Sequence, residues 1–189
     1  MEGCNTAVWK SIIDRYYTED KLRDILVGHS RQVADMALAI ASGQQLDIPR
    51  DNIETAAMLH DIGIIATHAP GICCFGTQPY LMHGSIGATM LREAGAPDWA
   101  CDVAERHTGA GLLRNDIIAA GLPDPGHDLL PRTVLERLIC YADKFFSKTH
   151  IGAPAKPIER VRASIAKFGA EALARFDALH AEFGGVLNL

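Results

Sequence analysis

Apolar residues recur at intervals of three and four along most of the chain, the spacing that puts them on one face of an α-helix. The longest such segment covers 21–43. No stretch alternates apolar and polar residues for long enough to predict a strand. The pattern therefore predicts an all-α fold, a bundle of seven to nine helices. The expected helices cover 6–17, 21–43, 51–61, 83–95, 97–107, 114–120, 132–148, 157–169 and 171–183.

Glycine and proline mark the ends of several of these segments. Gly43 is expected to cap the second helix, and Gly63 is expected to adopt a positive φ where the third helix ends. Pro97 suits the first turn of the fifth helix. A loop over 65–81 joins the third and fourth helices, and the three prolines of 121–131 exclude a continuous helix there.

The composition limits the architecture and the compartment. A chain of 189 residues, 48% of them hydrophobic, is long enough to bury one continuous core. We therefore expect a single domain over 1–189, with C-terminal helices over 156–184 that pack on the rest. The five cysteines form neither a disulfide framework nor a C-x-x-C metal pattern, so reduced thiols are expected, with Cys101 and Cys140 in the core.

Charge and hydropathy exclude several classes of partner. A net charge of −5 without a basic block provides no attraction for a nucleic-acid polymer. No apolar run approaches the ~20 residues of a membrane span. The start MEGCNTAVWK lacks the basic and apolar regions of a secretory signal. A cytoplasmic protein without a membrane partner is expected, and the oligomeric state is left open.

Polar residues interrupt the apolar rows at positions where the core is expected. In the second helix His29 lies between Leu26 and Val33 on the same row, and in the third His60 follows Ala56 by four residues. Burying such side chains costs free energy unless they find partners.

Three further helices repeat this arrangement. His83 precedes an apolar row, His107 ends one, and Asp143 lies four residues after Ile139 and three before Phe146. A carboxylate facing the core loses its charge unless a cation lies beside it.

The number of these residues favours a metal site over isolated core histidines. A single histidine on an apolar row is most often a satisfied core residue, and His180, which also lies near a row, has no companion. Four of the eight histidines and two aspartates are predicted to face the core, and this number is not expected if each were an unrelated core residue. Imidazole and carboxylate ligands without thiolates suit zinc, iron, manganese, cobalt or nickel, and they disfavour a structural zinc finger. His68, His127 and His150 fall in loops and are not assigned to the site.

The order of these residues resembles that of the HD superfamily of metal-dependent phosphohydrolases, with the HDIG form of the motif at 60–63. The similarity covers about 20–150 and implies an all-α bundle with a central metal site. It further implies two divalent transition metals, with iron the first choice and manganese, zinc, cobalt or nickel the others. Asp61 would bridge them and, with His60, form the catalytic pair. The implied metal ligands are His29, His60, Asp61 and Asp143 for one metal and His83 and His107, found in the binuclear branches, for the second.

Within the superfamily the order and spacing are similar to those of the bacterial HD-type diadenosine tetraphosphatases. The basic residue that those enzymes carry shortly after the HD pair is absent, because Gly63, Ile64 and Ile65 follow here. The chain also lacks the extra histidine pair and the G-Y-P element of the cyclic-di-GMP phosphodiesterase branch.

The resemblance implies hydrolysis of a phosphate ester or anhydride of a small molecule, with a nucleotide as the expected substrate, by metal-activated water. Four residues that lie next to or one turn from the proposed ligands are candidates for binding phosphate oxygens, although solvated positions on helix surfaces are an equal alternative for each. They are Arg106, Thr108, Lys144 and Lys148.

Two other functions remain open at this point. Some binuclear HD relatives hold di-iron and cleave a carbon bond with O₂, and their six ligands look the same. A non-catalytic module that senses a metabolite is the third hypothesis, which the complete ligand set disfavours.

Overall fold

The computed structural model describes residues 5–186, so Cys4 lies outside the described residues. Nine α-helices make up most of this range, which confirms the all-α prediction. No helix of 5–186 is both long and apolar enough to cross a membrane. The helices are α1 (Asn5–Tyr16), α2 (Asp20–Gly43), α3 (Arg50–Leu59), α4 (His83–Glu93), α5 (Asp98–Arg106), α6 (Arg114–Ala119), α7 (Val134–Asp143), α8 (Ile158–Ile165) and α9 (Ala170–Phe183).

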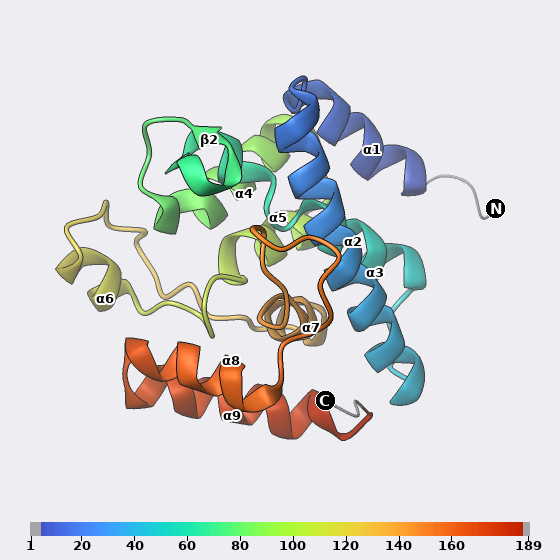
Figure 1. Cartoon of the computed structure of the whole chain (residues 1–189), viewed down its shortest axis with the longest axis vertical. Helices are drawn as coiled ribbons and strands as arrows, with labels where there is room; N and C mark the ends of the chain where they lie inside the picture. The colour runs from blue at the N-terminus through green and yellow to red at the C-terminus, as the bar shows by residue number, and fades with distance from the viewer. Residues whose placement is uncertain (1–4, 187–189) are drawn as a thin grey trace.

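The helix α2 is 24 residues long and runs along one side of the molecule (Figure 1). In Figure 1, α1 lies across one end of α2, and the pair α8 and α9 forms a layer on the opposite side of the molecule. Helix α7, seen nearly end-on, lies between that layer and the rest. The apolar row of α2 is buried as the spacing predicts, and it packs against α3 and α7. On the other side, Phe176 and Phe183 of α9 are fully buried against Tyr141 of α7.

The loop between α3 and α4 is the least helical part near the site. It holds the two-residue strands β1 (His68–Ala69) and β2 (Cys74–Phe75), which pair antiparallel, and short 3₁₀ turns. The four cysteines of the described residues are free, and Cys101 and Cys140 are buried as expected.

Helix α7 is shorter than the 132–148 that the apolar pattern predicts. It begins after the cap residue Thr133 and ends at Asp143. Beyond that point the chain leaves the helix. The Lys156 ammonium donates to the carbonyl oxygens of Lys144 and Phe146 at 3.1 and 2.8 Å, in place of the backbone N–H groups of a further helical turn. Phe145 is fully buried. The apolar residues after Asp143 therefore fill the core from a loop, which periodicity alone does not distinguish from a helix.

Gly63 is needed for a reason other than the one expected from the sequence. Its φ is not positive. A Cβ at this position would lie 2.2 Å from the backbone oxygen of His83 and 2.5 Å from the backbone nitrogen of Gly87. The glycine therefore lets the segment after α3 lie directly against the first turns of α4, which brings His60 and His83 to the same site.

Replacing Gly63 with alanine is expected to destabilise the protein by about 3 kcal/mol or more, because the added methyl group meets backbone atoms that cannot rotate away. Gly71→Ala is the matched control, since nothing lies within 4 Å of a Cβ there and φ is not positive. Urea unfolding followed by circular dichroism measures both. Equal stability of the two variants would contradict this account of the α3 to α4 contact.

Candidate metal centre

Five helices each deliver buried polar side chains to one point in the centre of the bundle. His29 comes from the middle of α2, and His83 is the first residue of α4. The other four lie at helix C-termini, where the chain leaves the helix and can turn a side chain inward. All six are at most 8% exposed: His29, His60, Asp61, His83, His107 and Asp143.

One group of ligand atoms surrounds the Oδ2 atom of Asp61. The Nε2 atom of His29 lies 3.2 Å and that of His60 3.1 Å from this oxygen. The Oδ1 atom of Asp143 is 2.9 Å from His29 Nε2 and 3.5 Å from His60 Nε2. These four residues offer one atom each within 4.8 Å of one another, a set that could hold a metal ion.

A second group surrounds the other oxygen of the same carboxylate. The Nε2 atoms of His83 and His107 lie 3.4 and 3.3 Å from Asp61 Oδ1, and they are 3.0 Å from each other. These three residues also form a set within 4.8 Å. Asp61 is therefore shared, with one oxygen turned to each group.

Hydrogen bonds at the far side of three rings fix which nitrogen faces the centre. The Nδ1 atoms of His60, His83 and His107 lie 2.6, 2.6 and 2.8 Å from the carbonyl oxygens three residues earlier in the chain. A carbonyl only accepts, so Nδ1 carries the proton, and this assignment leaves Nε2 as a bare lone pair. Backbone partners of this kind orient histidines that bind metals.

The tautomers leave the second group with bare nitrogen lone pairs that suit a cation. Burial, followed by the neighbouring His107, lowers the pKa of His83 to about 3, and burial lowers the pKa of His107 as well. Both rings are therefore neutral near pH 7. Two lone pairs 3.0 Å apart and a carboxylate oxygen then converge without a proton between them. Such an arrangement is repulsive unless a cation occupies the space, so the residues fit a bound metal.

The buried carboxylate of Asp61 supports the same conclusion. Neither oxygen of Asp61 nor Nε2 of His60 has a hydrogen bond of good geometry within 5–186, although each is buried. Burial opposes ionisation of Asp61, but His60 and Lys148 hold its pKa well below the usual range. A buried, ionised carboxylate whose oxygens lack hydrogen bonds of good geometry is a suitable donor to a metal ion.

Three of the four residues expected to bind substrate lie beside this cluster. The Lys148 ammonium is 2.6 Å from Asp61 Oδ2, and the Lys144 ammonium is 2.5 Å from Asp143 Oδ2. The hydroxyl of Thr108 is 3.4 Å from Nε2 of His83. Their roles toward a substrate stay predictions.

Arg106 is not brought to the cluster. Its guanidinium lies 3.0 Å from Glu136 and 3.1 Å from Asp102. Glu136 also completes a capping box with Thr133 at the start of α7. Arg106 therefore joins α5 to α7, and we leave it out of the proposed substrate site.

The remaining histidines of the chain lie elsewhere, as expected. His68 and His150 are exposed, and His127 is 3.5 Å from Glu105. His180 pairs with the hydroxyl of Tyr141 at 2.8 Å, which explains its place near an apolar row without a metal.

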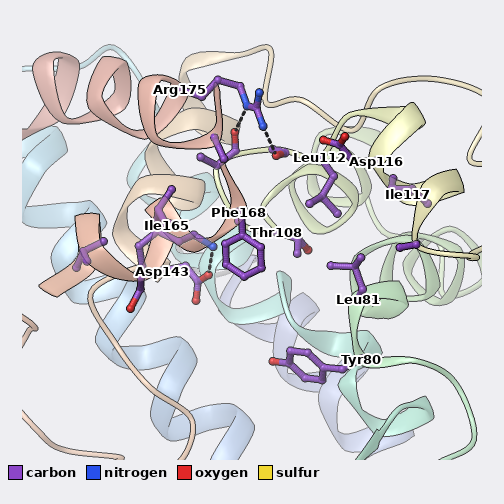
Figure 2. A pocket seen from close by; sticks show the side chains of 18 of the residues that line it. Tyr80, Leu81, Thr108, Leu112, Asp116, Ile117, Asp143, Ile165, Phe168 and Arg175 are labelled. Atoms are coloured by element: carbon purple, nitrogen blue, oxygen red, sulfur yellow. Dashed lines mark hydrogen bonds and ion pairs between the residues drawn. The ribbon is translucent and has the colours of Figure 1, made fainter. Parts of the chain in front are cut away.

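A pocket of about 600 Å³ opens directly beside the cluster. Asp143 and Thr108 line one part of it (Figure 2), and Lys144 and Lys148 line it as well. Tyr80 also lines the pocket, and its ring stacks on His83 with centroids 4.7 Å apart. Helical periodicity does not identify Tyr80, because this residue lies in a loop outside every apolar row.

Comparison with known proteins gives a match to the HD domain family over residues 26–147. A tRNA (cytidine(56)-2'-O)-methyltransferase of Thermoplasma volcanium is 34% identical over 125 residues, which are 66% of this chain and 32% of that protein. An uncharacterised protein of Methanocaldococcus jannaschii is 34% identical over 121 residues, 64% of this chain and 63% of that one. The chain thus spans from about one third to just under two thirds of the length of these relatives.

A similar fold is found in the HD domain of the L. monocytogenes phosphodiesterase PgpH. The match has a TM-score of 0.53 at 18% identity and covers 95% of this chain and 98% of that one. The same domain in complex with cyclic-di-AMP matches with a TM-score of 0.52.

Proposed function

This chain belongs to the HD domain family, and from that premise we propose that it is a metal-dependent phosphohydrolase. The proposed substrate is a phosphate ester or anhydride of a small molecule, with nucleotides as the first class to test. The observation that carries the proposal is the division of the Asp61 carboxylate between two sets of inward nitrogen atoms. The PgpH domain of similar fold is a phosphodiesterase solved with a nucleotide, which supports the choice of substrate class. The methyltransferase relatives match over only a third of their length, so their named activity is not carried over.

We propose two metal sites, of which iron is the first candidate and manganese, zinc, cobalt and nickel are the others. His29, His60, Asp61 and Asp143 would hold one ion, and Asp61, His83 and His107 the other. Bound metals would supply a water of lowered pKa that attacks phosphorus, and they would neutralise charge as the P–O bond breaks.

The chain's own residues supply binding and orientation. The Lys144 and Lys148 ammonium groups lie against Asp143 and Asp61. Each can turn to a phosphate oxygen, because both side chains line the pocket. The Thr108 hydroxyl offers a further donor at the same end. Two cations next to the cluster favour an anionic phosphate over an uncharged substrate.

Removing a ligand of the second site alone is expected to lower the number of metal ions bound per chain by one. His83→Ala should lower the bound metal from two ions per chain to one, because only Asp61 and His107 remain to hold the second. His180→Ala is the matched control, since His180 pairs with Tyr141 outside the cluster. Mass spectrometry of the metals after gel filtration measures both. Two ions per chain in His83→Ala would exclude the proposed second site.

The oxygenase alternative uses the same ligands, but it requires oxygen as a co-substrate, which a hydrolase does not. A hydrolase releases phosphate under nitrogen as fast as in air and remains active with manganese or zinc. Consumption of oxygen coupled to turnover, with no activity under nitrogen, would replace the hydrolase proposal by the oxygenase.

A further inference from the structure

The pocket beside the cluster has a second part, which is lined mainly by apolar side chains. Beyond the lysines its walls are mostly apolar, formed from the loop before α4, from the region of α6 and from the C-terminal helices. Asp116 and Arg175 also line this part, and the Arg175 guanidinium donates to the backbone oxygens of Ala110 and Gly111. Figure 2 shows the Phe168 ring near the middle of the view, with Ile165 and Asp143 to one side and Leu81, Leu112 and Ile117 to the other. The polar end and the apolar end therefore belong to one cavity.

Phe168 is the most unusual part of this wall. Its side chain is 75% exposed, although it lines the pocket. It ends a short 3₁₀ turn, and Gly169 follows with a φ of 104°, a conformation that L side chains rarely adopt. The turn into α9 thus holds the ring at the edge of the pocket, where a ligand would cover it.

Part of the apolar wall lies outside the region that matches the family. The family match ends at residue 147. Ile165 and Phe168 lie beyond it, on the layer formed by α8 and the turn before α9. The metal centre and the lysines lie at or next to the matched region, so the C-terminal layer adds a wall to a site that the family region builds.

We propose that this apolar end selects the alcohol part of the substrate, so that the enzyme prefers phosphate monoesters whose alcohol carries an apolar, planar group. This inference rests on the proposed phosphohydrolase function. The phosphate would bind at Lys144, Lys148 and the cluster, while the planar group lies between Phe168 and the side chains of Leu112 and Ile117. A cavity of about 600 Å³ has room for a ring system of this kind.

The test uses two esters that differ only in the group the pocket would bind. Ethyl phosphate and 3-phenylpropyl phosphate both release a primary alkanol, so their intrinsic reactivity is matched. With the manganese-loaded protein, kcat/KM for the phenylpropyl ester is expected to be about 10- to 50-fold higher, the gain for burying one aromatic ring. Phe168→Ala should lower this ratio about three- to tenfold through loss of the aromatic contact.

Two further variants separate the pocket from general effects. Phe75→Ala is the matched control, because Phe75 is 74% exposed and lies on β2 outside the pocket; it should keep the ratio. Ser164→Trp places a large side chain at an exposed position of the pocket wall and should lower the ratio as Phe168→Ala does. Equal kcat/KM for the two esters, or an unchanged ratio in both pocket variants, would overturn the proposal.

Binding of the corresponding phosphonates keeps this test independent of catalysis. Calorimetry with ethylphosphonate and 3-phenylpropylphosphonate should show the same preference and the same loss in Phe168→Ala. If neither ester is hydrolysed but the phosphonate preference persists, hydrolysis of phosphate monoesters fails and the apolar pocket stands. If both esters are hydrolysed and the phosphonates bind equally, the function stands and the pocket proposal is wrong.

Discussion

Replacing Asp61 with asparagine is expected to lower phosphate release by at least about 10³-fold, more than the 10- to 100-fold cost of losing an outer-shell partner of a metal ligand. The reason is that both oxygens of this carboxylate face nitrogen ligands, Oδ2 toward His29 and His60 and Oδ1 toward His83 and His107. Asparagine has the same shape, but it has no charge and offers only one oxygen. It cannot bridge two metals, so both metal content and turnover should fall together.

The control for this variant is Asp35→Asn, which makes the same chemical change at an exposed position of α2. It should retain full activity and full metal content. Phosphate release is measured with a colorimetric assay at saturating metal, and circular dichroism checks that both variants are folded. An Asp61→Asn protein that keeps more than a tenth of the activity would show that this carboxylate does not bridge the reacting centre.

Removing the metals is expected to destabilise the protein strongly. The Nε2 atoms of His83 and His107 face each other at 3.0 Å, and the buried oxygens of Asp61 lack hydrogen bonds of good geometry, so these groups repel one another unless a cation lies between them. A metal present at 1,000 times its Kd stabilises the folded state by about 4 kcal/mol. For a domain of this size that corresponds to a fall in Tm of roughly 8–16 °C on chelation.

Scanning calorimetry with and without a chelator measures this shift. The Asp61→Asn variant provides the comparison, because a protein that no longer holds the metals should have the same Tm in both buffers. A wild-type Tm that is insensitive to the chelator, in protein shown to contain metal beforehand, would contradict the link between the cluster and the stability of the bundle.

The parts of the site that follow helical periodicity were predictable from the sequence. His29, His60, His83, His107 and Asp143 were found because each occupies an apolar row, and the structure buries all five around one point. The helices were also found, since local spacing determines which face is buried. What the spacing could not give is the division of the two Asp61 oxygens, which depends on how five helices pack.

The positions of the proposed phosphate-binding residues were harder to predict from the sequence, because they depend on where helices end and on contacts between distant residues. Lys148 was selected as a residue one turn beyond Asp143, but α7 ends at Asp143 and the lysine reaches Asp61 from a loop. Arg106 pairs with Glu136, thirty residues later, and nothing local reveals such a contact. The T-x-x-E pattern at 133–136 is a capping box and marks the start of α7, just after the Arg132 at which the predicted helix begins.

The sequence predicts a positive φ at Gly63, and this prediction is wrong. A glycine after a helix is usually explained by positive φ, whereas here it permits contact between two backbones. The distinction requires the position of α4, which is twenty residues further along the chain. The need for glycine at position 63 therefore follows from a tertiary contact with α4, which local sequence patterns do not reveal.

The central claim is that metals held at Asp61 make this protein a phosphohydrolase, and a titration of activity tests it most directly. Protein freed of metal is supplied with manganese in fractions of an equivalent, and phosphate release from a panel of nucleotides and phosphate esters is measured at each step. The account predicts no release without metal and a rise that saturates at two equivalents per chain. Release that does not depend on metal, or none from any substrate at two bound equivalents, would contradict it.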